Sequence, residues 1–125
     1  MNFKEYQEKA LKTKGNYTDN IDQLINGVMG LTGESGEVID IVKKFMYQGH
    51  QLDEDKIINE LGDTLWYINL IANSINMSLE DIAKYNIDKL EKRYPKGYFR
   101  VEDSVNRSEK MWLKKVIIQL KKIIL

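Results

Sequence analysis

The chain has 125 residues, 19 basic and 19 acidic residues, and no cysteine. Zero net charge gives no basic footprint for nucleic acid, and the lack of cysteine excludes disulfides and thiolate metal sites and fits a reducing cytoplasm. No apolar run approaches the roughly 20 residues that a membrane span needs, and Met1 to Gly15 is charged throughout, unlike a secretory signal. We therefore expect a cytoplasmic protein whose small size makes oligomerisation useful for burying a core.

The first half of the chain predicts two helices. Apolar spacing indicates a short helix over 2–13 and a long one over 21–47, and the turn residues of 14–20 predict the loop between them. The long segment contains four glycines, each costing about 1 kcal/mol in a helix interior relative to alanine. We expect them to allow close approach of another backbone, a partner or a ligand; the alternative is a break into two shorter helices. These glycines are Gly27, Gly30, Gly33 and Gly36.

The second half predicts two more helices. A third should begin at the acids 53–55, which suit the positive end of a helix, and run to 75. Ser78, with Asp81 three residues later, predicts the start of a fourth, and Pro95 ends it. Four helices with short loops predict an all-α antiparallel four-helix bundle.

The end of the chain predicts a separate tail. Residues 98–108 are polar and irregular, whereas 109–125 has helical apolar spacing interleaved with lysines. Three interpretations compete: an extra helix that packs on the bundle or on a neighbouring subunit, a loosely held tail, and a basic surface helix that binds membranes. We therefore divide the chain into a domain over 1–108 and a C-terminal helical tail over 109–125.

Two pairs of acids three residues apart stand out, Glu34 with Glu37 and Glu60 with Asp63. On a helix this spacing stacks two side chains on one face, about one turn apart. If the two helices pack side by side, four carboxylates converge, which is costly unless a hard cation such as Mg²⁺ neutralises them. The competing interpretation is a solvated helix face with ordinary ion pairs.

The position of these acids beside apolar residues favours the metal site. With about 100° per residue, Glu34 falls inside an apolar arc of Val38, Ile41, Val42 and Phe45. Glu60 lies beside a similar arc on the next helix, made by Ile57, Leu61, Leu65 and Ile68. Neither arc contains a Lys or Arg, so acids that border a core there need another partner.

These segments resemble the MazG-like all-α nucleoside triphosphate pyrophosphohydrolases and their relatives, the dCTP pyrophosphatases and dimeric dUTPases. The resemblance covers about 1–108 and is most specific at the acid pairs. The similar segments are Gly30 to Val38, Lys43-Lys44, Glu60 to Asp63, Lys89-Leu90, Arg93 to Pro95 with Gly97, and Ser104 to Arg107.

The resemblance implies an enzyme that uses Mg²⁺, or alternatively Mn²⁺, to hydrolyse (deoxy)nucleoside triphosphates between the α- and β-phosphates. Together with the small size, it implies a homodimer or homotetramer. From the charge balance and the lack of a long apolar run, we expect binding to neither nucleic acid nor membrane. Its implied metal ligands and catalytic residues are Glu34, Glu37, Glu60 and Asp63. Its implied substrate-binding residues are Lys44, Tyr67, Lys89, Arg93, Asn106 and Arg107.

Two alternatives remain at this point. A related pyrophosphohydrolase specific for dUTP, dCTP or phosphoribosyl-ATP would use similar acids, because base choice depends on pocket contacts that spacing does not reveal. A non-catalytic helical binding module would keep the bundle without the reaction, although all four acids stand in order in this chain.

Overall fold

A computed structural model describes residues 1–107 and 117–123, and every regular element in these residues is helical. The labelled helices are α1 (Phe3–Leu11), α2 (Asn20–Tyr47), α3 (Glu54–Ser74), α4 (Leu79–Arg93) and α5 (Val101–Val105); residues 117–123 are helical as well. The all-α prediction is thus confirmed. The chain divides into two compact units, Met1–Ala83 and Lys84–Leu125, which we describe separately.

Local capping explains where the long helices begin. The Asp19 carboxylate accepts a hydrogen bond from the Asp22 amide (2.8 Å) at the start of α2, and Asp53 caps α3 in the same way through Lys56 (3.0 Å). These bonds satisfy amides that have no partner inside the helix. The predicted helices over 21–47 and 53–75 are therefore observed within a residue or two of their expected ends.

The fourth helix and its surroundings are partly as predicted. The Asp81 amide donates to the Ser78 hydroxyl (3.0 Å) ahead of α4, which confirms the expected start, and α4 ends two residues before Pro95. The prediction that 98–108 is irregular is wrong in part, because α5 lies within this segment. Of the predicted tail, 117–123 is helical, and 109–116 and 124–125 lie outside the described residues.

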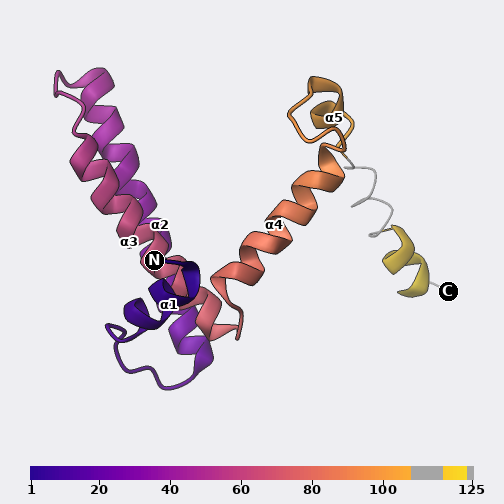
Figure 1. Ribbon diagram of the computed structural model, residues 1–125, viewed down its shortest axis with the longest axis horizontal. Coiled ribbons are helices and arrows are strands. Elements are labelled where there is room, and N and C mark those ends of the chain that lie inside the picture. Colours follow the sequence, from indigo (N-terminus) through magenta and orange to yellow (C-terminus); the bar gives the residue numbers. More distant parts are fainter. Residues whose placement is uncertain (108–116, 124–125) are drawn as a thin grey trace. The chain divides into compact units, whose positions relative to one another are not determined.

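The first unit is built on the antiparallel pair of α2 and α3, which run side by side in Figure 1. Gly27 and Gly30 face α3 directly, and no break interrupts α2. The close-approach interpretation of the glycines is thus confirmed at these two positions. Contacts follow one register: Gln23 with Asn73, Gly27 with Ile71, Gly30 with Tyr67, and Glu34 with Asp63.

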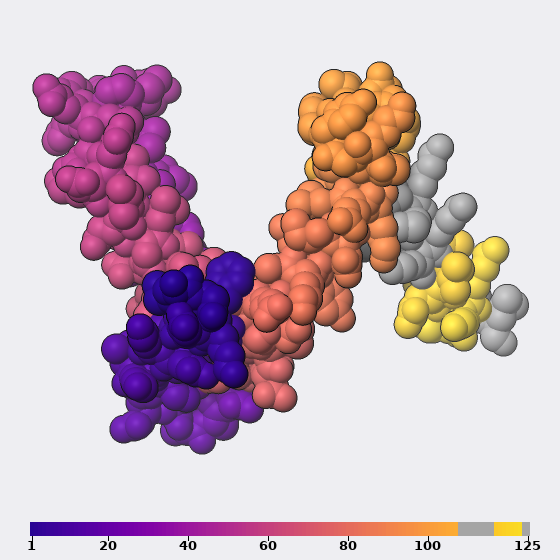
Figure 2. All heavy atoms as spheres, viewed as in Figure 1, coloured from indigo at the N-terminus to yellow at the C-terminus, as the bar shows by residue number. Residues whose placement is uncertain are grey.

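The buried apolar core of this unit comes from α1, α3 and the start of α4. Leu70 and Ala72 of α3 are fully buried, and Ala10 of α1 and Leu79 of α4 are nearly so. The Trp66 indole joins the helices by donating to the Thr13 hydroxyl (2.8 Å). Figure 2 shows that α1 covers only the part of the hairpin far from its turn.

The predicted apolar arcs are only partly buried. Val42 and Phe45 are 41% and 44% exposed, and Leu61 is 52% exposed. The face of α2 that meets α3 contains Gly27, Gly30 and Glu34, so α3 covers the arc only in part and leaves its outer residues exposed. Within the described residues, no helix is long and apolar enough to cross a membrane.

Candidate metal centre

Three of the four predicted acids converge between α2 and α3. One carboxylate oxygen each from Glu34, Glu60 and Asp63 lies within 4.8 Å of the other two. The antiparallel register produces this cluster, because it places the middle of α2 opposite the middle of α3. No Lys or Arg in residues 1–107 or 117–123 forms an ion pair with these three side chains.

Crowding of the carboxylates changes the acidity of Glu34. Partial burial raises the pKa of Glu34, and a hydrogen bond with the Glu60 carboxyl and the negative charge of Asp63 raise it further. Charged carboxylates this close repel one another, so one of them keeps its proton more readily when no cation is bound. This behaviour is expected of a cation site.

The cluster fits a hard divalent cation. All three donors are carboxylate oxygens, the ligand type that Mg²⁺ prefers, and two oxygens about 2.1 Å from one Mg²⁺ lie at most about 4.2 Å apart. The observed limit of 4.8 Å is close to that spread. Small side-chain rotations would suffice to bring the three oxygens to one ion.

Glu37 lies beside this cluster rather than within it. It lines a hollow of about 360 Å³ together with Glu60, Lys44, His50 and further residues near the turn of the hairpin. The negative charge of Glu37 contributes to the raised pKa of Glu34, so it lies within electrostatic reach of the cluster. The hollow therefore joins the acid cluster to basic side chains.

The Lys44 ammonium is held by a residue that sequence reasoning missed. Lys44 Nζ lies 2.6 Å from an Asp40 carboxylate oxygen, and Lys43 Nζ lies 3.0 Å from the other oxygen. These bonds lower the pKa of Asp40, and the bond to Asp40 raises the pKa of Lys44. The spacing of four residues between Asp40 and Lys44 could have predicted this pair.

A second missed neighbour is Tyr6 of α1. Burial raises the pKa of the Tyr6 phenol, and the negative charge of Asp63 raises it further. Nothing in the spacing of the N-terminal helix predicts this, because the approach of α1 to the acids depends on tertiary packing. The acid cluster thus has α1 as well as α2 and α3 in its surroundings.

Tyr67, a predicted substrate-binding residue, lies in the same unit as the acids. An ideal Cβ built on Gly30 would lie only 2.1 Å from Tyr67 Cε1, so the ring occupies the space that a side chain at position 30 would need. The Tyr67 ring also meets the Trp66 ring edge to face, with centroids 5.0 Å apart. These contacts fix the ring next to the acid cluster.

The other predicted substrate-binding residues lie in the second unit. Lys89 and Arg93 are on α4, and Asn106 and Arg107 follow α5. Arg107 donates to the Tyr94 hydroxyl (3.3 Å), and this bond lowers the pKa of Tyr94. Arg107 therefore has a defined neighbour within its own unit.

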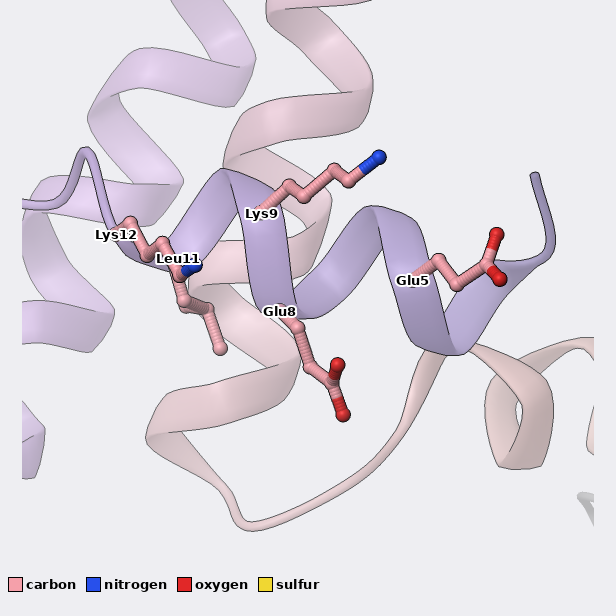
Figure 3. A pocket seen from close by; sticks show the side chains of 5 residues that line it. All are labelled: Glu5, Glu8, Lys9, Leu11 and Lys12. Atoms are coloured by element: carbon pink, nitrogen blue, oxygen red, sulfur yellow. The ribbon is translucent and has the colours of Figure 1, made fainter.

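A hollow of about 600 Å³ along α1 has no acid-cluster residue in its lining. Figure 3 shows the side chains of Glu5, Glu8 and Lys9 pointing away from one another. Side chains that diverge in this way cannot converge on one ligand. Three of the predicted acids, by contrast, converge between α2 and α3.

Comparisons with known proteins identify the family of the chain. The sequence model of the family described as "MazG nucleotide pyrophosphohydrolase domain" matches residues 25–111. The chain is also similar to the Gene 37 protein of Mycobacterium phage L5, with 35% identity over 83 residues that cover 63% of this chain and 73% of the phage protein. That name states no activity. No solved structure matches the chain.

Proposed function

Because the chain belongs to the MazG nucleotide pyrophosphohydrolase family, we propose that it hydrolyses nucleoside triphosphates to a nucleoside monophosphate and pyrophosphate with the help of Mg²⁺ or Mn²⁺. The observation that best supports this proposal is the convergence of Glu34, Glu60 and Asp63 without a basic partner among the described residues. Glu37 would complete the set as a fourth carboxylate beside the hollow.

The acids would serve both binding and proton transfer. Bound Mg²⁺ would offset the negative charge of the triphosphate and make water at the site more acidic. A carboxylate of the cluster would accept a proton from the attacking water. As the water oxygen bonds to the α-phosphorus, the bond from that phosphorus to the bridging oxygen breaks, and pyrophosphate leaves with the electron pair.

Basic residues would bind the phosphates. Lys44 lines the same hollow as Glu37 and Glu60, and its bond to Asp40 limits the conformations of its side chain. Arg93 and Arg107 could each bind two phosphate oxygens through their planar guanidinium groups. We assign the same general role to Lys89, and contacts with the nucleotide to Asn106 and Tyr67.

A product analysis in ¹⁸O-labelled water tests the reaction. The native chain would be given a panel of ribo- and deoxynucleoside triphosphates, including dUTP and dCTP, with Mg²⁺. Attack at the α-phosphorus places the label in the monophosphate, whereas attack at the β-phosphorus places it in pyrophosphate. Label in the monophosphate supports the proposal, and release of orthophosphate or no release from any nucleotide contradicts it.

We also propose that the chain forms a homodimer through an exposed stripe of α2. The stripe alternates steps of three and four residues, as coiled-coil seams do. At its middle are Thr32 and Ser35, whose hydroxyls donate to carbonyls of their own helix and so leave no unpaired donor. We call this set the α2 stripe: Ile21, Ile25, Val28, Thr32, Ser35, Ile39, Val42 and Met46.

A second copy of the chain is a suitable partner for the α2 stripe. Ile21 and Ile39 are 62% and 69% exposed, and large exposed apolar surfaces commonly mark protein interfaces. Two antiparallel copies of α2 would bring four helices together, α2 and α3 of each chain. The small residues at the middle of the stripe would allow the helices to cross closely.

A further inference from the structure

We propose that the Tyr67 ring, packed on Gly30, is a spacer that fixes the distance between α2 and α3 at the acid cluster. This makes Gly30 and Tyr67 positioning residues for the metal site. The inference rests on the proposed function, because it concerns how the chain holds the acids that would bind Mg²⁺. It assigns Tyr67 a task that is independent of any contact with the nucleotide.

The contact lies one helical turn from the acids on both helices. Gly30 precedes Glu34 by four residues on α2, and Tyr67 follows Asp63 by four residues on α3. A Cβ on residue 30 would approach Cε1 of Tyr67 to 2.1 Å, and Cδ1 and Cζ to 2.3 Å. Because real Cβ atoms do not approach other atoms so closely, a methyl group at position 30 requires the ring or the helices to move.

The ring is not free to move aside. Its edge-to-face contact with Trp66 limits one direction, and Trp66 is itself anchored to α1 through Thr13 (2.8 Å) and the Ala10 carbonyl (3.3 Å). Packed aromatic rings resist displacement because protein interiors are close-packed. An added methyl group at position 30 is therefore expected to push α2 away from α3.

The spacer is local, because the next glycines along α2 have no such contact. Nothing lies within 4 Å of a Cβ built on Gly33 or Gly36. Gly33 is thus a matched control: it lies on the same helix, one turn from Gly30, and adds the same methyl group when changed to alanine. Both substitutions improve helix propensity, so a difference between them reports the contact with Tyr67.

Metal affinity is the quantity that the spacer should control. Removing the groups that orient metal ligands typically lowers metal affinity by about 10- to 100-fold. We expect Gly30→Ala to weaken binding of Mn²⁺ by at least about tenfold, whereas Gly33→Ala should bind Mn²⁺ like the native chain. Binding would be measured by electron paramagnetic resonance of free Mn²⁺, without nucleotide, on proteins whose helix content is checked by circular dichroism.

A double-mutant cycle with Tyr67→Ala separates the spacer from general damage to the fold. Once the ring is absent, adding the methyl group of Gly30→Ala should no longer weaken Mn²⁺ binding, so the two changes should be strongly non-additive. Tyr67→Phe keeps the ring and should bind Mn²⁺ like the native chain. If Gly30→Ala fails to fold, the contrast between Tyr67→Phe and a weakened Tyr67→Ala supplies the test.

The outcomes distinguish this inference from the proposed function. If folded Gly30→Ala binds Mn²⁺ with native affinity, the spacer role is overturned and the metal site stands. The same holds if Gly30→Ala lowers Mn²⁺ affinity equally in chains with and without the Tyr67 ring. Native affinity in Tyr67→Ala would overturn it as well. Absence of Mn²⁺ binding by the native chain would instead contradict the metal site itself, and the spacer with it.

Discussion

At the scale of single residues, the acid cluster makes the metal-free chain sensitive to pH. Since the folded chain raises the pKa of Glu34, it binds more protons than the unfolded chain at pH values between the ordinary and the raised pKa. The contribution of Glu34 to the free energy of unfolding is therefore present at low pH, and it is lost as the pH rises through the raised pKa. A bound cation should oppose this loss, because it neutralises the carboxylates.

We predict that Glu34→Gln removes this part of the pH dependence. Glutamine stays neutral, so metal-free Glu34→Gln should lose less stability than the native chain when the pH rises above the usual range of glutamate. Urea unfolding at a series of pH values, with a chelator present, measures the difference. Parallel pH profiles of the two proteins would show that Glu34 does not titrate as the structure implies.

Lys44 and Lys43 are neighbours whose roles in phosphate binding can be compared by mutation. Both contact Asp40, but only Lys44 lines the hollow with Glu37 and Glu60. Losing a charge-assisted hydrogen bond costs about 1.5–3 kcal/mol, or roughly tenfold or more in affinity. We expect Lys44→Ala to raise the KM for nucleoside triphosphate by about this factor and Lys43→Ala to change it little, as steady-state kinetics would show. Equal effects of both variants would remove Lys44 from the phosphate site.

At the scale of helices, a buried amide fixes the register of α2 and α3. Gln23 is 3% exposed, and its Nε2 donates to the Leu70 carbonyl (2.9 Å) and to Asn73 Oδ1 (2.8 Å). Lys14 Nζ, in the preceding loop, donates to the side-chain oxygen Oε1 of Gln23 (3.2 Å). One side chain thus joins three segments at the end of the hairpin far from its turn.

We predict that Gln23→Ala destabilises the fold by about 1–3 kcal/mol, because buried partners lose their hydrogen bonds and a void remains. Chemical denaturation measures this loss. The exposed Gln119 provides a control, and Gln119→Ala should change stability by less than about 0.5 kcal/mol. A Gln23 variant as stable as the control would show that this amide does not hold the register.

At the scale of the whole molecule, the exposed α2 stripe predicts a homodimer. We expect Ile39→Glu to convert the dimer to a monomer, because it places a charge in the middle of an apolar seam. Light scattering coupled to size-exclusion chromatography measures the molar mass. Ile75→Glu, at a position 53% exposed and outside the stripe, should remain dimeric. A native chain that is monomeric at high concentration would contradict the prediction.

The parts of this structure that sequence could predict are those that local residues determine. The acids at 53–55 and Ser78 with Asp81 predicted the starts of two helices nearly to the residue, and the turn residues of 14–20 predicted the start of α2. The three-residue spacing of the acids predicted four converging carboxylates, of which three converge. The short helix α5 was missed because no side chain caps its start. Hydrogen bonds between residues far apart in the sequence produce no short motif from which they could be predicted.

Tertiary packing determined what the sequence could not reveal. Helical periodicity located an apolar arc on α2, but it could not show that α3 packs closely at Gly27 and Gly30 and leaves Val42 and Phe45 partly exposed. Periodicity gives the width of an apolar face of a helix, but it does not show which helix packs on that face. For the same reason, sequence could not distinguish Gly30, where an added Cβ would meet the Tyr67 ring, from Gly33, where an added Cβ would have open space.

We propose that the acid cluster between α2 and α3 performs the reaction, and the Glu60→Gln variant is the sharpest test of this role. Pyrophosphate release from nucleoside triphosphates with Mg²⁺ would be measured for the native chain, for Glu60→Gln, and for Glu54→Gln, which removes an exposed acid at the start of α3. We predict a loss of at least about 100-fold for Glu60→Gln with unchanged folding, and near-native activity for Glu54→Gln. Equal activity of Glu60→Gln and the native chain would contradict the account.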